Sequence, residues 1–285
     1  MWARRASVPY LLVLPATIVF AVFFIAPLVT LTINSFYDYG RLTGIVHVFT
    51  LKNYQRIWLD SFYLEVVGRT LRLASMTAVV TILVGYPVAI YLTLVSARIR
   101  GLIIFLVLSP LLISVIVRTF GWVMIIGPNG LLQSVLSGFG VQGVHFLHTE
   151  AAVIVGLVNV LMPFVVLAVV TALQAIDPAV PFAASSLGAS PWRVFFKVIL
   201  PLSLPGLLAG LLIVFSLASS TFVTPAVLGG SQYKVLSTIM YQQALILQNW
   251  PFAAAVAITL VMIVLVAVTL QTRLIERGRF RAVFQ

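Results

Sequence analysis

Six long apolar runs, separated by shorter polar stretches, dominate the pattern of hydrophobic and polar positions along this chain. A helix needs about 20 apolar residues to cross about 30 Å of hydrocarbon, whereas the strands of a membrane barrel alternate apolar and polar residues. The pattern therefore predicts an all-α integral membrane protein with a single transmembrane domain over residues 1–285. Its six spans are expected at about 10–33, 70–95, 102–126, 151–173, 202–222 and 252–271.

Composition excludes a soluble protein. The chain is 62% hydrophobic and 8% charged, with a mean hydropathy of +1.16, whereas soluble domains are about 25% charged. The net charge of +11 does not indicate nucleic-acid binding, because the cations lie at span ends and in short loops, without a basic patch interleaved with aromatic residues. With no cysteine, the chain has no disulfide and no thiolate metal site.

The distribution of cations sets the expected topology. The first apolar run follows two arginines and exceeds the about 7–15 residues of a signal-peptide core, so we expect a retained span that starts in the cytoplasm. Cytoplasmic segments of membrane proteins are rich in lysine and arginine. Six spans with both termini inside satisfy this rule, although Arg41, Lys52, Arg56, Arg69 and Arg72, among others, fall on the outer side. The expected cytoplasmic cations are Arg4, Arg5, Arg98, Arg100, Arg193, Lys197, Arg273, Arg277, Arg279 and Arg281.

The first outer segment, residues 34–68, is rich in aromatic side chains and carries charges of both signs. Aromatic residues at this density are typical of the headgroup level of a bilayer, and we favour this interpretation over a ligand-binding loop. A short interfacial helix is expected at Leu51–Trp58.

Polar side chains inside the predicted spans are the candidate gate or pore residues. Arg118 lies about 25 Å along a helix that starts at Gly101, which fits either a side chain that reaches the outer headgroups or a gate. An asparagine in the fourth span fits a hydrogen bond between helices or a place on the transport path, and the serines of the fifth span give it a polar face that avoids lipid. The set is Arg118, Trp122, Asn159, Ser216, Ser219 and Ser220.

A polar, cation-bearing stretch, FAASSLGASPWRVFFKVILP, lies between the fourth and fifth apolar runs. It predicts a short helix with small side chains, a break at Gly188, and a second helix with Ser190 as N-cap and Pro191 at its first position. Pro201 is expected to end this second helix. One interpretation is an amphipathic loop that lies on the membrane. The other is a helix pair that docks into the groove of a partner.

The string A-A-x3-G-x9-V-x-L-P, from Ala183 to Pro201, resembles the coupling motif of permease subunits in type I ABC importers, E-A-A-x3-G-x9-I-x-L-P. Phe182 replaces the glutamate of that motif, and Val198 replaces its isoleucine. The resemblance implies that residues 177–201 form a cytoplasmic loop whose helices sit in a cleft of the ATP-hydrolysing subunit. The residues it assigns to coupling are Phe182, Ala183, Ala184, Gly188, Ala189, Ser190, Arg193, Phe195, Phe196, Lys197, Leu200 and Pro201.

Three other groups of residues, at 109–122, 224–230 and 249–251, resemble the permeases of polyamine importers. The resemblance implies the pore subunit of an importer in the bacterial inner membrane that works by alternating access. The expected solute is a polyamine such as spermidine or putrescine. Related permeases carry opines, amino-acid-like compounds, ferric ions or oxyanions, and these remain alternatives.

The sequence carries no phosphate-binding G-x-x-x-x-G-K-[ST] string and no catalytic constellation, so we expect a non-enzymatic subunit. His145 and His148 have too few further ligands nearby to predict a metal site. The resemblance places ATP and Mg²⁺ in a partner ATPase dimer, with no cofactor in this chain. It also implies a solute-binding protein and a second permease, and Phe182 favours a different, homologous chain for the latter. A stand-alone secondary transporter or channel would carry acidic residues within its spans, and the predicted spans have none.

Overall fold

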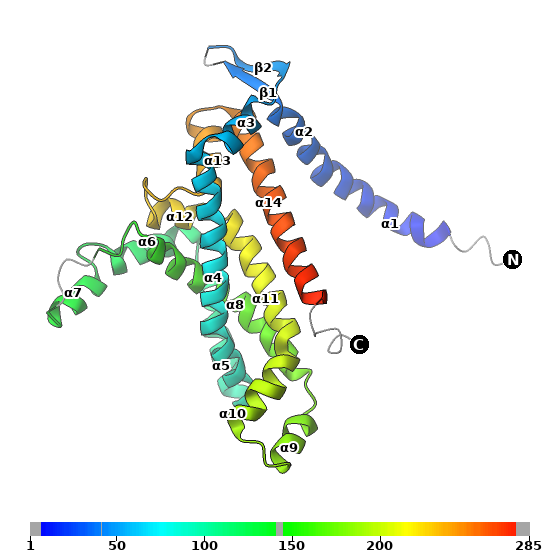
Figure 1. The fold of residues 1–285 in the computed structure, drawn as a ribbon, viewed down its shortest axis with the longest axis vertical. Coiled ribbons are helices and arrows are strands. Elements are labelled where there is room, and N and C mark those ends of the chain that lie inside the picture. Colours follow the sequence, from blue (N-terminus) through cyan, green and yellow to red (C-terminus); the bar gives the residue numbers. More distant parts are fainter. Residues whose placement is uncertain (1–6, 41, 141–144, 278–285) are drawn as a thin grey trace. The chain divides into compact units, whose positions relative to one another are not determined.

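The computed structural model describes residues 7–40, 42–140 and 145–277 (Figure 1). Arg4, Arg5, Arg279 and Arg281, counted above as cytoplasmic cations, lie outside this part of the chain. The chain divides into two compact units, residues 1–64 with 239–261 and residues 65–238 with 262–285. Within the described residues, six helical segments are long and apolar enough to cross a membrane: Val13–Ser35, Ser61–Leu94, Val115–Gly138, Glu150–Gln174, Pro191–Ser220 and Trp250–Arg273.

The first unit begins with a long apolar helix formed by α1 (Ser7–Phe20), a π-helical turn (Ala21–Ile25) and α2 (Ala26–Ser35). The turn precedes Pro27, and within it the Ala26 N–H bonds to a carbonyl five residues back. Such a wider turn carries the helix past a proline without breaking it. Apolar side chains of this helix, such as Phe23, are exposed within the chain, as expected for a surface that lipid or another subunit covers.

A β-hairpin follows the first span. Strand β1 (Tyr37–Gly40) pairs antiparallel with β2 (Gly44–Phe49), which the hydrophobic pattern did not indicate. The next element, α3 (Lys52–Leu59), forms at the expected interfacial helix. Its Asn53 amide donates hydrogen bonds to the carbonyls of Ser35 (3.0 Å) and of the first β1 residue (2.9 Å), which fixes the hairpin to the end of α2.

The core of the second unit is the pair of helices α8 (Glu150–Gln174) and α11 (Leu200–Ser220). Gly206 and Gly210, four residues apart on α11, allow close contact, because a Cβ on Gly206 would lie 2.5 Å from the Ala172 Cβ. Small residues with this spacing let two membrane helices approach until their backbones meet. Helix α4 (Ser61–Leu94) contributes buried residues to the same core.

The predicted third span at 102–126 is not one continuous helix, because the chain breaks there into α5 (Ala97–Leu112) and α6 (Val115–Ile126). Pro110 has no N–H to donate to the Leu106 carbonyl, and the Ser109 hydroxyl donates to that carbonyl instead, at 2.8 Å. Ile113 and Ser114 then adopt extended backbone angles before α6 begins. The apolar segment at this place runs over Val115–Gly138.

Short helices lie in several connections between the long ones. They are α7 (Leu131–Gly138), α12 (Val223–Leu228), α13 (Leu236–Tyr241) and a π-helical turn (Gln242–Ile246). The last helix is α14 (Trp250–Arg277), which is longer than the expected span, and α4 likewise begins nine residues before its expected start. Apolar runs mark where a helix is buried in lipid, whereas these helices continue into polar residues.

Candidate functional site

Helix α9 (Ala179–Ser186), the turn at Gly188 and helix α10 (Pro191–Val194) form a compact feature that we call the hook, residues 179–194. In Figure 1 the hook lies at the end of the second unit opposite α12. Gly188 has a φ of +81°, the left-handed geometry that glycine adopts without strain. The Gly188 N–H bonds to the Ser185 carbonyl (2.9 Å) and the Ala189 N–H to the Ala184 carbonyl (3.2 Å). These two bonds form a Schellman cap that turns the chain sharply.

Ser190 takes the N-cap position of α10 with extended backbone angles, and Pro191 follows at the first helical position. Ser190 is thus at the predicted N-cap position, although its hydroxyl makes no capping hydrogen bond. The helix does not end at Pro201, contrary to the prediction. A π-helical turn over Phe195–Ile199 lets the Leu200 N–H bond five residues back, so the helix passes the proline and continues into α11.

The aromatic residues of this region divide between an inner and an outer surface. The Phe195 ring packs edge-on against Tyr86 of α4, with 6.0 Å between the ring centroids, and so holds the hook to the chain's own core. Phe196 is 55% exposed and stacks on Trp192, which is 74% exposed. Phe182, in the position of the motif glutamate, is 71% exposed on α9. The outer aromatic side chains thus form an apolar surface without a covering element in the described chain.

The other residues assigned to coupling surround this surface. Arg193 and Lys197 are exposed, four residues apart on one helical face. Ala183 is exposed, whereas Ala184 and Ala189 are half-buried where the two short helices meet. Leu200 and Pro201 are half-buried at the start of α11.

Arg118, on the first turn of α6, lies at the break between α5 and α6. Its guanidinium donates to the carbonyls of Pro110 and Ile113, the latter at 3.4 Å, at the break between α5 and α6. Carbonyls at the end of a helix have no intrahelical partner, and in a membrane such groups are costly to leave unpaired. The Arg118 side chain therefore supplies hydrogen-bond donors to the carbonyls at the end of α5.

Replacing Arg118 with methionine should lower the thermal stability of the purified protein, because the substitution keeps an apolar stem but leaves these carbonyls unpaired. Hydrogen bonds to a charged donor contribute about 1.5–3 kcal/mol, so we expect a fall of several degrees in melting temperature. Lysine at this position should restore part of the loss. A methionine variant as stable as the native chain would show that the contact contributes little.

The remaining candidate gate residues lie in two environments. Trp122 packs half-buried against the core of the second unit. Asn159 is half-buried on α8, and within the described chain its side chain makes no hydrogen bond. The fifth-span serines donate to carbonyls of their own helix: Ser216 to Leu212 (2.8 Å), Ser219 to Phe215 (2.7 Å) and Ser220 to Ser216 (3.2 Å). Their hydroxyls are thus largely satisfied without another helix.

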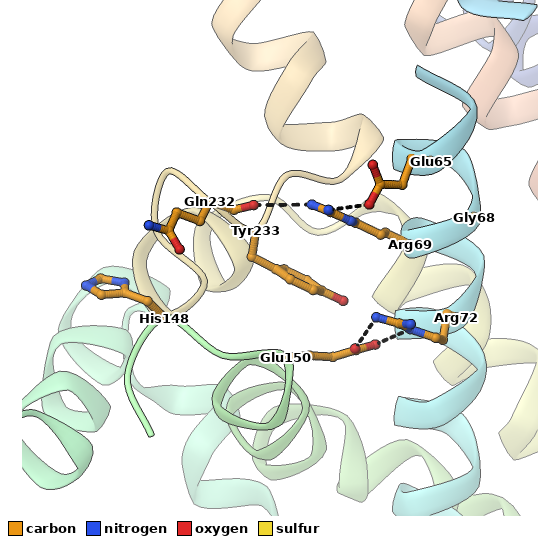
Figure 2. Close-up of a pocket in the computed structure, with 8 residues that line it drawn as sticks. All are labelled: Glu65, Gly68, Arg69, Arg72, His148, Glu150, Gln232 and Tyr233. Atoms are coloured by element: carbon orange, nitrogen blue, oxygen red, sulfur yellow. Dashed lines mark hydrogen bonds and ion pairs between the residues drawn. The ribbon is translucent and has the colours of Figure 1, made fainter. Parts of the chain in front are cut away.

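A polar cavity of about 530 Å³ lies between the start of α4, the start of α8 and the segment before α13, and the sequence pattern did not indicate it (Figure 2). Within the described residues, no group of three or more histidine, cysteine or acidic side chains is placed to hold a metal ion. The residues that line the cavity are far apart in the sequence. The one sequence signal for it was the opposite charge of Arg72 on α4 and Glu150 at the start of α8. Its lining residues are Glu65, Gly68, Arg69, Arg72, His148, Glu150, Gln232 and Tyr233.

Residues 66–279 match the family model described as "Binding-protein-dependent transport system inner membrane component". The chain belongs to this family. It is therefore an ABC importer permease and a multi-pass protein of the inner membrane, with six transmembrane helices.

Relatives of this permease include two proteins named "Spermidine/putrescine transport system permease protein PotB". The Haemophilus influenzae protein is 34% identical over 74% of each chain. The Escherichia coli protein is 32% identical over 81% of this chain and 84% of its own length. Among solved structures, the permease shares its fold with a chain of a bacterial ABC transporter for the import of alginate. That match has a TM-score of 0.81 and 20% identity, and covers 97% of each chain.

Proposed function

We propose that this permease imports a polyamine such as spermidine or putrescine, delivered by a solute-binding protein and driven by a separate ATPase. The assignment of the solute rests on the similarity to permeases named for spermidine and putrescine, at 34% and 32% identity over most of the chain. Opines, amino-acid-like compounds, ferric ions and oxyanions are the alternative solutes. ATP and Mg²⁺ would bind to the partner ATPase dimer.

The hook supports the coupling role. It presents Phe182 and Trp192 outward beside Phe196, while Phe195 packs against α4 at its base. Association with a partner that covers such an apolar surface is favourable, because it removes the exposed side chains from water. Because Phe182 replaces the motif glutamate, contact with the ATPase at this point would depend on apolar packing and not on an ion pair. Arg193 and Lys197 would lie at the rim of that contact.

Charge supports an orientation with the hook in the cytoplasm and both chain termini on the same side. In Figure 1 the start of α5, with Arg98 and Arg100, lies at the same end of the second unit as the hook. Arg193 and Lys197 add two cations there, whereas Arg69 and Arg72 at the opposite end are balanced by Glu65 and Glu150. An excess of lysine and arginine favours the cytoplasmic side.

The permease would pair with a second, homologous permease that keeps the motif glutamate. Asn159 and Ser220 are then the polar side chains that we assign to the transport path or to the contact with the second permease. The two ATPase subunits would close on ATP, move both hooks and open the path to the outside. This cycle requires ATP to bind one conformation more tightly than the other.

The proposal can be tested with the complete complex in proteoliposomes. With ATP inside and the solute-binding protein outside, we expect saturable uptake of radiolabelled putrescine or spermidine. Molybdate, ferric citrate, an amino acid and an opine form the comparison set. Uptake of one of these in place of polyamines would overturn the solute assignment and leave the importer intact. Uptake by this chain alone, without the ATPase, would overturn the coupling mechanism.

A further inference from the structure

Tyr86 joins α4 to the base of the hook by two contacts in the core of the second unit. Its ring packs edge-on against Phe195, the first residue of the π-helical turn. Its hydroxyl lies 2.8 Å from the hydroxyl of Ser203 on α11. One contact is at the start of the π-helical turn and the other is beyond its end, so α4 is attached where the hook continues into α11.

The hydrogen bond between Tyr86 and Ser203 is buried at both ends. The Ser203 hydroxyl donates to the Leu200 carbonyl at 3.1 Å. Since a serine hydroxyl has one proton, the Tyr86 hydroxyl is the donor to Ser203. Breaking this bond would leave a buried hydroxyl without a partner, which is costly. The contact therefore opposes any separation of α4 from the start of α11.

The residue after Tyr86 is the point where α4 bends most easily. Pro87 lies inside α4 and has no N–H to donate to the carbonyl four residues earlier, and sharp kinks in helices occur mostly at proline. On the other side of Tyr86 in the sequence, Gly85 packs closely on α8, because a Cβ there would lie 3.2 Å from Cγ1 of Val165. Helix α4 is thus supported at Gly85, and the part that follows Pro87 can tilt about this point.

We propose that Tyr86 transmits the movement of the hook to α4. The inference rests on the proposed function, in which an ATPase moves the hook. When the base of the hook shifts, the Phe195 contact and the hydrogen bond to Ser203 carry Tyr86 with it, and α4 bends at Pro87. Packed side chains and hydrogen bonds of this kind carry coupling between distant sites. Tyr86 is then a positioning residue, which acts by setting the place of a helix.

Tyr86→Phe tests the inference, because it removes the hydroxyl and keeps the ring against Phe195. In the complete complex in proteoliposomes, we expect the uptake of radiolabelled putrescine per ATP hydrolysed to fall about fivefold, the lower end of typical coupling between sites. Capture of the ATPase by tagged permease should not change, because the exposed side chains of the hook are kept. A purely structural role would lower uptake and ATP hydrolysis together and leave their ratio native.

Two further variants show whether the hydrogen bond is responsible. Ser203→Ala removes the other partner and should lower the ratio by a similar factor, and the double variant should be no worse than either single variant. Tyr91→Phe changes an exposed tyrosine of α4 and is the matched control, which should keep the native ratio. A native ratio in Tyr86→Phe would overturn the inference, and so would a double variant in which the two losses multiply.

A second arm measures the movement of α4 and does not depend on the identity of the solute. The chain has no cysteine, so spin labels can be attached through Leu94→Cys at the end of α4 and Leu167→Cys on α8, both at exposed positions. The distance between the labels should change when the native complex binds a non-hydrolysable ATP analogue. Tyr86→Phe should lose most of that change.

The two arms separate a failure of this inference from a failure of the proposed function. Labels that move equally in the native and Tyr86→Phe complexes, or that do not move in the native complex, would overturn the inference even if putrescine is taken up normally. A label movement that depends on Tyr86 in a complex that does not take up putrescine would support the inference and overturn only the proposed solute.

Discussion

Replacing Gly206 with valine should prevent α8 and α11 from packing and should leave little folded protein in the membrane. A Cβ at this position would lie 2.5 Å from the Ala172 Cβ and 2.6 Å from the Ala168 carbonyl oxygen. The carbonyl belongs to the backbone of a helix in the core and cannot rotate away, so the helices must separate. Overpacking of a rigid core costs about 1–3 kcal/mol or more, and separation would also expose the buried valines of α8.

The yield of monodisperse protein and its melting temperature measure this effect. Gly101→Val is the matched control, because a Cβ there meets nothing within 4 Å although the residue is also helical. The control carries the same change in helix propensity, so the difference between the two variants isolates the contact between helices. If both variants fold equally well, the close approach of α8 and α11 is not required.

Gly188→Val should fold normally but lose at least nine-tenths of ATP-driven uptake. A Cβ at Gly188 meets nothing within 4 Å, so no clash arises, but its φ of +81° strains a β-branched residue by about 1–3 kcal/mol. The hook would then favour another turn, in which α9 and Trp192 of α10 no longer face the ATPase together.

Two measurements separate this loss of coupling from a loss of stability. The first is the capture of the ATPase by tagged permease, which should fall with uptake while the melting temperature of the isolated permease stays close to native. The second uses Gly188→Asn, because asparagine tolerates left-handed geometry and should retain most of the uptake. Full uptake by the valine variant would show that the hook does not transmit work from the ATPase.

The sequence predicted those parts of the fold that depend on local chemistry. Apolar runs of about 20 residues located most of the membrane helices, because hydrocarbon imposes this length on any helix that crosses it. The break at Gly188 and the start of α10 at Pro191 also followed from the backbone preferences of these residues. The matched family model confirms the permease assignment for which the string from Ala183 to Pro201 was the main signal.

The sequence-based predictions failed where a tertiary contact or a π-helical turn determined the local structure. The apolar run at 102–126 looks continuous in the sequence. The helix can break there because Arg118 donates hydrogen bonds to the carbonyls of Pro110 and Ile113, which the break leaves without helical partners. Pro201 looked like a helix end because the preceding π-helical turn has no sequence signal that we recognised. The polar cavity could not be predicted, because Arg72 and Glu150 are 78 positions apart and meet only through the packing of α4 and α8.

The unbroken path of helix from Pro191 to Ser220 has a mechanical consequence. Thirty residues at about 1.5 Å each make a stiff rod of about 45 Å that reaches from the aromatic tip to the glycine contacts with α8 and beyond. A displacement applied at the tip is therefore transmitted along one continuous helix, in which the π-helical turn over Phe195–Ile199 and Pro205 are the points where bending is easiest.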